Sequence, residues 1–176
     1  MKPLIPLAKL NFDTGAGVIS ICANAFGLSH LNFIPQSTDG WKTRELTVDD
    51  TTDVEALALA KTHLNQAKSE LLEYLAGERQ QFNVALAPKG TEFQQQVWQA
   101  LSKLGFGETC SYADIATKIG RPKAVRAVGT ANGANPIAII VPCHRVIGKN
   151  GTLTGYAYGI ALKQKLLEME GINLIK

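Results

Sequence analysis

The first third of the chain alternates between apolar and polar residues, which predicts β-strands. This alternation runs over residues 7–12, 18–23 and 28–33, and the segment 13–17, DTGAG, has the composition of a turn. Short strands joined by turn residues predict an antiparallel meander. The polar stretch 35–51 that follows predicts a loop.

The apolar period then lengthens from two residues to about 3.6, which predicts a helix. Thr52, with Glu55 three residues later, has the pattern of a capping box, and leucines recur at helical spacing until Gly77 supplies a C-terminal stop. The apolar run 82–86 predicts a short strand, and residues 87–90 predict a linker.

Capping residues also mark the helices that are expected in the second half of the chain. Thr91 with Gln94 predicts a helix that ends at Gly105. Ser111 with Asp114 repeats the same pattern and predicts a second, shorter helix. The second half is therefore expected to be mostly helical.

A tight turn at Gly120 follows the short helix. Pro122 suits the first position of the next helix, which runs through Arg126 and ends near residues 133–136. This order predicts a helix-turn-helix, although a plain αα-hairpin inside a core gives the same pattern. The second helix carries almost nothing bulky except Arg126, so its backbone can approach another surface closely, which favours nucleic acid over helix packing.

The last third predicts a buried segment, a loop and a final helix. The apolar run 137–141 predicts a buried strand or extended segment, and the glycine-rich stretch 149–159 predicts a loop. Residues 160–170 predict a helix that is closed by Gly171.

These elements predict an α+β protein of two domains, a β-meander with a helix over residues 1–87 and a mostly helical domain over residues 88–176. The charge changes sign at this boundary, from seven Lys/Arg against ten Asp/Glu before it to eleven against five after it. No Asp or Glu occurs from Ile115 to Leu167. A surface of one sign favours a polyanionic partner, although a solvated basic face has the same composition.

The cysteines indicate the compartment. Cys22, Cys110 and Cys143 are odd in number and form no CxxC pair, which is typical of reduced, intracellular proteins, so we expect a cytoplasmic location. No apolar run approaches the length of a membrane span, so we expect no membrane partner.

The stretch IIVPCHRVIG, residues 139–148, places a thiol beside an imidazole, Cys143 and His144. A cysteine in apolar surroundings is usually a small hydrophobic residue, and this interpretation suits Cys22 and Cys110. A positive neighbour lowers the pKa of a thiol, which favours Cys143 as a nucleophile. Adjacent side chains point opposite ways in an extended chain, so contact between the thiol and the imidazole needs a turn or a bridging water.

His144 in turn needs an acid to orient it, and the candidates in this half are Glu168, Glu170 and Asp114. Metal binding is a weaker alternative, because no second Cys–His pair occurs at zinc-finger spacing; we predict no metal and no cofactor. A cysteine hydrolase uses the same three residue types, but it gives no role to the acid-free stretch.

Three stretches, NPIAIIVPCHRVIG, TEFQQQVWQAL and YADIATKIGRPKAVRAVGTANG, resemble the O6-alkylguanine-DNA alkyltransferases, also called methylated-DNA–protein-cysteine methyltransferases. The similarity covers essentially the whole chain and is closest to the short bacterial form. It implies a ribonuclease-H-like scaffold domain followed by a winged-helix-like domain that binds DNA. The implied activity is DNA repair, in which the alkyl group of a flipped O6-alkylguanine, or of O4-alkylthymine, passes once to Cys143.

The resemblance implies a role for each residue of the site. Cys143 would be the acceptor, His144 its base through a water, and Glu170 the group that orients His144. Asn135 would hold the turn before the acceptor, and Tyr112 would lie against a phosphate and the flipped guanine.

The resemblance also implies which residues bind DNA and the base. The second helix of the pair would enter the minor groove, and Arg126 would fill the gap in the base stack. The implied DNA contacts are Arg126, Tyr112, Lys123, Ala127, Gly129 and Asn132. The implied pocket residues are Val146, Tyr156, Ala157, Tyr158 and Lys163.

Two positions depart from the family pattern. Ala157 stands where some members have serine, and Tyr158 replaces a common glycine, which predicts a narrowed or covered pocket. The expected partner is double-stranded DNA with an alkylated guanine, bound by a monomer. The rival functions are a lesion-flagging or regulatory DNA-binding module of the same fold, whose members lack the cysteine, and a thiol hydrolase.

Overall fold

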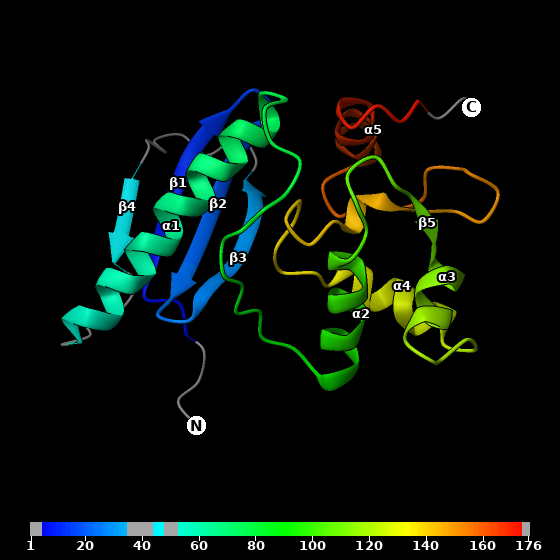
Figure 1. Ribbon diagram of the computed structural model, residues 1–176, viewed down its shortest axis with the longest axis horizontal. Helices are drawn as coiled ribbons and strands as arrows, with labels where there is room; N and C mark the ends of the chain where they lie inside the picture. Colours follow the sequence, from blue (N-terminus) through cyan, green and yellow to red (C-terminus); the bar gives the residue numbers. More distant parts are fainter. Residues whose placement is uncertain (1–4, 35–43, 48–52, 174–176) are drawn as a thin grey trace. The chain divides into compact units, whose positions relative to one another are not determined.

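The computed structural model describes residues 5–34, 44–47 and 53–173, and the chain divides into two compact units, residues 1–89 and 90–176. The protein has a mixed α/β architecture (Figure 1). The first unit contains an antiparallel sheet of four strands and one helix among its described residues. The described part of the second unit contains four α-helices and a two-stranded parallel sheet.

The sheet of the first unit contains the predicted meander, which is confirmed. β1 (Ala8–Thr14), β2 (Gly17–Asn24) and β3 (Gly27–Ile34) pair in sequence, and the sheet order is β3-β2-β1-β4. The prediction of a loop over residues 35–51 is wrong for β4 (Arg44–Thr47), which pairs antiparallel with β1. A strand that pairs along one edge is held by backbone hydrogen bonds, and these need no alternating pattern.

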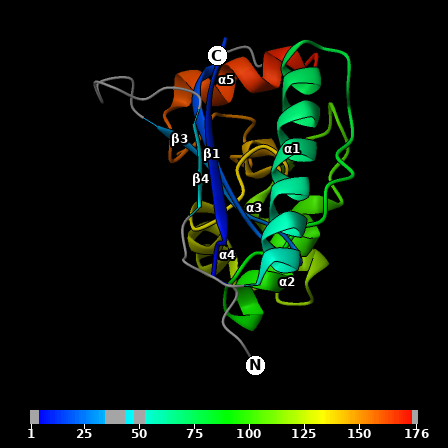
Figure 2. The ribbon, with the colours of Figure 1, turned by 90° about the vertical axis from the view of Figure 1, so that its left-hand side faces the viewer.

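α1 (Val54–Leu75) covers one face of this sheet and packs against β1, β2 and β3 (Figures 1 and 2). Asp53 caps the helix by accepting a hydrogen bond from the Ala56 amide at 3.0 Å. The predicted cap, Thr52, lies outside the described residues. The chain leaves the helix at Gly77, whose φ of 80° is the left-handed conformation expected of a C-terminal glycine.

The strand predicted over residues 82–86 is wrong, because a side chain takes the hydrogen bonds that a neighbouring strand would use. The Asn83 and Val84 amides both donate to Oε1 of the buried Glu70, at 2.6 and 3.1 Å. Only an isolated bridge between Leu28 and Leu86 remains within the described part of this segment.

The helices of the second unit are α2 (Glu92–Ser102), α3 (Tyr112–Lys118), α4 (Val125–Gly133) and α5 (Ile160–Met169). The first three pack on one another, and α5 packs against residues 143–145. The capping boxes predicted at the starts of α2 and α3 are both present. α2 packs against α3 and α4, and the Trp98 indole donates to the Ala131 carbonyl at 2.9 Å. This packing fixes α4, the helix that carries Arg126.

The prediction that Pro122 opens a helix is wrong. The chain makes a separate turn over residues 121–124, in which the Ala124 amide donates to the Arg121 carbonyl at 2.9 Å, and α4 begins only at Val125. Proline is also favoured at the second position of such a turn, because its fixed φ suits both places.

The strand or extended segment predicted over residues 137–141 is also wrong, although the segment is buried as expected. The Val141 amide donates back to the Ile137 carbonyl at 3.1 Å, and Ile139 has a φ of 69°. A left-handed conformation is strained for a β-branched residue, and strain of this kind clusters at functional sites. The short strand β6 (Val146–Ile147) comes later and pairs in parallel with β5 (Cys110–Ser111).

Candidate active site

Cys143 begins a single turn of 3-10 helix, Cys143–Arg145, at the end of this buried segment, and the cysteine is only 6% exposed. Asn135 holds the segment in place from both ends of its carboxamide. Its Nδ2 donates to the Val141 carbonyl at 2.8 Å, and its Oδ1 accepts from the Ile137 amide at 3.0 Å. The turn that presents the thiol is therefore fixed by one side chain.

His144 lies completely buried beside Cys143 in the sequence and meets Glu170, the C-cap of α5. The distance from His144 Nε2 to Glu170 Oε2 is 2.6 Å. Of the other two acids considered from the sequence, Asp114 accepts from the Ser111 amide in the capping box of α3, and Glu168 is exposed and bonded to Gln164. Glu170 is thus the acid that the fold brings to the imidazole.

Arg145 has a structural role that the sequence interpretation missed. Its Nε donates to Glu170 Oε1 at 2.7 Å, and its Nη1 donates to the Leu104 carbonyl at 2.6 Å. Glu170 Oε1 also accepts from the Gly107 amide at 3.1 Å. A buried carboxylate needs a cation and further hydrogen bonds. In the sequence, this requirement was the one signal that Glu170 would have a basic partner such as Arg145.

Burial dominates the electrostatics of Cys143 and His144. Burial raises the pKa of the Cys143 thiol, and the hydrogen bond from Asn135 and the charge of Lys163 offset only part of this rise. The expectation that positive neighbours lower this pKa is therefore wrong in direction. Burial lowers the pKa of the His144 imidazole, and the contact with Glu170 opposes the change. At neutral pH the thiol and the imidazole are both uncharged.

The contact with Glu170 determines which nitrogen of His144 carries the proton. A carboxylate only accepts hydrogen bonds, so Nε2 carries the hydrogen and Nδ1 has the free lone pair. Nδ1 is buried and has no hydrogen-bond partner in the described part of the chain. The arrangement therefore provides a buried proton acceptor.

Lys163 of α5 joins the Cys143 segment to the glycine-rich loop. Its ammonium group is buried and donates to the Val146 carbonyl at 2.6 Å and to the Thr154 carbonyl at 2.9 Å. Burial lowers the pKa of Lys163 to about 8. The predicted pocket residue Val146 is thus engaged through its carbonyl oxygen.

A narrow cavity of about 20 Å³ opens beside the thiol. The lining residues come from the end of α4, the Cys143 segment and the loop before α5, and they are Asn132, Gly133, Asn135, Cys143, Gly155, Tyr156, Ala157 and Tyr158. The rings of Tyr156 and Tyr158 meet edge to face, with their centroids 5.6 Å apart. The predicted pocket residues 156–158 therefore lie at the thiol, and Asn132, predicted as a DNA contact, is buried at the same cavity.

The other predicted DNA contacts lie on and beside α4. Lys123, Arg126 and Ala127 are exposed, while Gly129 lies next to the Tyr112 ring, where an added Cβ would be 3.8 Å from Cδ1. The Tyr112 and Thr154 hydroxyls share a hydrogen bond of 3.0 Å.

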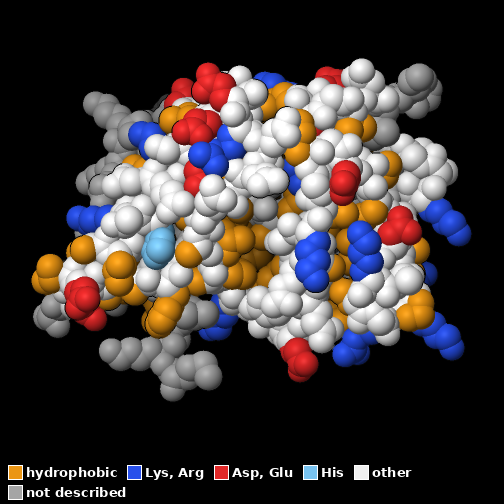
Figure 3. Space-filling model, viewed as in Figure 1, with side chains coloured by type: hydrophobic (Ala, Val, Ile, Leu, Met, Phe, Trp, Pro, Cys, Tyr) orange, Lys and Arg blue, Asp and Glu red, His pale blue; other side chains and the backbone are white. Residues whose placement is uncertain are grey.

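The basic residues of the acid-free stretch divide into two groups. Arg145 and Lys163 are buried and bonded within the site. The exposed members are Lys118, Arg121, Lys123, Arg126, Lys149 and Lys165. Figure 3 shows blue side chains in the right-hand part of the view, where Figure 1 places α2 and α3. The basic surface of this unit is therefore carried mainly by α3, α4 and the adjacent loops.

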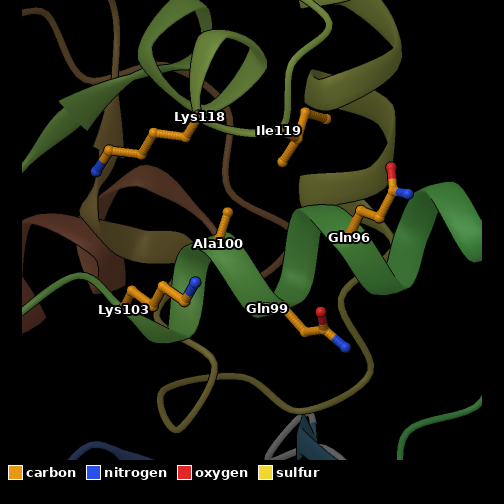
Figure 4. A pocket seen from close by; sticks show the side chains of 6 residues that line it. All are labelled: Gln96, Gln99, Ala100, Lys103, Lys118 and Ile119. Carbon is orange, nitrogen blue, oxygen red and sulfur yellow. The ribbon is translucent and has the colours of Figure 1, made fainter.

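A wider groove of about 480 Å³ lies between α2 and the end of α3 (Figure 4). Its lining residues are Gln96, Gln99, Ala100, Lys103, Lys118 and Ile119. None of them lines the Cys143 cavity, and none was singled out from the sequence as a site residue. The groove is thus separate from the cavity beside Cys143.

No group of three His, Cys, Asp or Glu side chains within the described residues is placed to hold a metal ion. No helix within them combines the length and apolar character that a bilayer span requires.

Comparisons with known proteins agree on one family. Residues 92–172 match the family model described as 6-O-methylguanine DNA methyltransferase, DNA binding domain. The methylated-DNA–protein-cysteine methyltransferase of Methanosarcina acetivorans is 45% identical, with 91% of this chain and 96% of that protein covered. The constitutive enzyme of the same name from Bacillus subtilis is 51% identical, over 78% of this chain and 81% of its own.

The fold is found in a solved structure as well. Mycobacterium tuberculosis OGT in complex with DNA superposes with a TM-score of 0.72 at 44% sequence identity. The match covers 91% of this chain and 90% of that one. The mixed α/β architecture therefore extends over both units of the chain.

Proposed function

This chain belongs to the family of methylated-DNA–protein-cysteine methyltransferases, and on that premise we propose that Cys143 is the residue that accepts the alkyl group. The protein repairs DNA by transferring an alkyl group from an alkylated base to a cysteine of its own. The observation that supports Cys143 is its position: a buried thiol at a cavity, next in sequence to a histidine whose Nδ1 is free to accept a proton. Cys22 and Cys110 have no histidine beside them in the sequence.

The proposed chemistry uses the neutral thiol and the neutral imidazole. The thiol proton passes to His144 Nδ1, through a water, and the thiolate attacks the alkyl carbon. An S–C bond forms as the C–O6 bond breaks, and the leaving guanine takes up the proton that His144 holds. Glu170 and Arg145 keep the imidazole in the accepting tautomer, and Asn135 holds the thiol in line. The product is a thioether, so each molecule reacts once.

The proposed DNA interface is α3 and α4. The short α3, the turn at Gly120 with its φ of 75°, and α4 have the order of a helix-turn-helix. The proposed minor-groove helix, α4, has the exposed Arg126 and the small Ala127 and Gly129 on a basic unit, so it can approach the backbone of DNA closely. Lys123 and Tyr112 flank it.

We propose that the remaining parts of the molecule have supporting roles. The first unit serves as a ribonuclease-H-like scaffold, because the residues of the proposed chemistry all belong to the second unit. A monomer is sufficient for the reaction, since one chain supplies the thiol, the base and its orienting acid. The cytoplasmic location stays a prediction.

Arg126→Ala should slow alkyl transfer from duplex DNA about ten- to hundredfold, because unstacking a base costs a few kcal/mol and a side chain in the stack offsets that cost. Transfer from the free base O6-benzylguanine should remain near the wild-type rate, since no stack is opened. Single-turnover rates with both substrates test this, with the exposed Lys149→Ala as a control. Equal losses on the two substrates would show that Arg126 supports the fold instead.

The rate of transfer from the free base should be nearly constant between about pH 6.5 and 7.5. Burial lowers the pKa of His144 from 6.5 and raises that of Cys143 from 9.0, so neither group exchanges its proton with solvent in this window. A proton that only moves from the thiol to the imidazole leaves the rate independent of pH. A rise of roughly tenfold per pH unit would instead mean that the thiol loses its proton to solvent before it attacks.

A further inference from the structure

The loop that lines the Cys143 cavity is tied to the rest of the unit at Thr154. The Thr154 side chain shares a hydrogen bond of 3.0 Å with the Tyr112 hydroxyl at the start of α3, and its carbonyl accepts from Lys163 of α5 at 2.9 Å. The cavity-lining residues, Gly155 to Tyr158, follow immediately. At the far side of these residues, the Gly159 amide donates to the Tyr156 carbonyl at 3.0 Å. Thr154 thus holds one end of a very short loop.

The cavity that this loop encloses is too small for a base. A volume of about 20 Å³ accommodates roughly one water molecule. A purine ring with its alkyl group is many times larger than a water molecule. If a base reaches the thiol, as the proposed function requires, residues 155–158 must move away from Cys143. The bonds made by Thr154 then decide how much this movement costs.

The two bonds of Thr154 differ in what could replace them. The bond from Lys163 lies inside the unit and holds the backbone, so it can persist as the loop moves. The Tyr112 hydroxyl lies in the proposed DNA interface, and its ring sits beside Gly129 of α4. A phosphate or base that arrives there offers the hydroxyl another hydrogen-bond partner. A free base in solution brings no phosphate to make that exchange.

We propose that Thr154 is a specificity-determining residue, whose hydroxyl bond to Tyr112 keeps the cavity closed until DNA engages Tyr112. The proposal rests on the proposed function. Thr154 touches neither the thiol nor the base in this scheme; it acts through Tyr112 and the loop. Its effect is to make the protein react with a base held in DNA in preference to the same base free in solution.

Thr154→Val tests this, because valine has the shape of threonine and lacks the hydroxyl. The variant should react with free O6-benzylguanine about two- to tenfold faster than the wild type, the range expected when one hydrogen bond no longer opposes opening. Its rate on duplex DNA that carries O6-benzylguanine should be unchanged. Thr154→Ser restores the hydroxyl and should restore the wild-type preference. Thr152→Val removes an exposed loop hydroxyl that bonds only locally to Asn150, and it serves as the matched control.

The other outcomes overturn the proposal. A Thr154→Val variant that is slower on both substrates would mean that the bond shapes a competent cavity. Equal acceleration on both substrates would show that opening of the cavity is not coupled to DNA binding. Unchanged rates on both would show that the Thr154 hydroxyl does not control opening. Hydrogen exchange of amides 155–158, measured without DNA, distinguishes a failure of this proposal from a failure of the proposed function. If the wild type leaves Cys143 unalkylated in intact-mass spectra, the proposed function fails, while faster exchange in Thr154→Val still reports whether the bond holds the loop.

Discussion

Replacing Cys143 with alanine should abolish alkyl transfer completely and leave binding to duplex DNA near the wild-type level. The thiol is the only group in the proposed scheme that forms a bond to the alkyl carbon, and the proposed phosphate and stacking contacts lie on α3 and α4. The fold should survive, because deleting one buried sulfur costs about 1 kcal/mol or a little more. Intact-mass spectra after incubation with DNA carrying O6-methylguanine measure the transfer, and a filter or gel-shift titration measures the binding.

The same spectra distinguish a single transfer from repeated turnover in the wild type. We expect one added methyl on the peptide that contains Cys143 and one equivalent of repaired guanine per protein, with no later product. Cys110→Ala and Cys22→Ala should behave as the wild type, because these two thiols are half-buried and neither lines the cavity beside Cys143. Product beyond one equivalent would point to a thiol hydrolase, and a methyl group on Cys110 would move the reaction to another site.

Local hydrogen bonds explain which elements the sequence could predict. The capping boxes of α2 and α3 each join residues three positions apart, so the sequence contains both partners of each bond within one turn. The alternating pattern of β1 to β3 is likewise local, since at least one face of each strand is buried in the core. These elements were predicted to within a few residues.

Distant partners explain the elements that the sequence mispredicted. The apolar run 82–86 has the pattern of a strand, but its amides bond to Glu70, more than ten positions earlier. The apolar run 137–141 predicts a strand. However, the hydrogen bonds of the Asn135 side chain hold this segment in a turn, in which Ile139 takes a left-handed conformation. Hydrophobicity predicted burial correctly in the second case, but burial alone does not specify a strand.

The site follows the same rule. Cys143 and His144 are neighbours, so the pair was visible in the sequence, whereas Arg145 reaches Glu170 across 25 positions and Tyr112 reaches Thr154 across 42. The expected lowering of the Cys143 pKa was wrong because burial raises that pKa by more than the neighbouring positive charges lower it. A sequence shows which charges are adjacent along the chain, but only the fold shows how deeply they are buried.

Glu170→Gln should lower the rate of alkyl transfer by roughly a hundred- to ten-thousandfold, because it reverses the tautomer of His144. A carboxylate can only accept, so it keeps the hydrogen on Nε2 and leaves Nδ1 as the base. A carboxamide that keeps its oxygen toward Arg145 presents its NH2 to His144, so Nε2 becomes the acceptor and Nδ1 carries the hydrogen. The imidazole then lacks a lone pair on the side where the thiol proton must go. The free base O6-benzylguanine is the substrate of choice, since it separates this effect from DNA binding.

Glu170→Ala should lose more stability than Glu170→Gln, because glutamine loses the negative charge but keeps an oxygen that accepts from Arg145. Removing the carboxylate leaves Arg145 buried without its counter-charge, with the Leu104 carbonyl still accepting from it, and breaking a buried ion pair in this way costs about 3–5 kcal/mol. Glu168→Gln, two residues earlier on the same helix and exposed, should match the wild type in both rate and denaturant midpoint. A Glu170→Gln variant that keeps the wild-type rate would show that Glu170 does not set the tautomer. In that case its contact with Arg145 would be its main role, and the larger loss of stability in Glu170→Ala would reveal it.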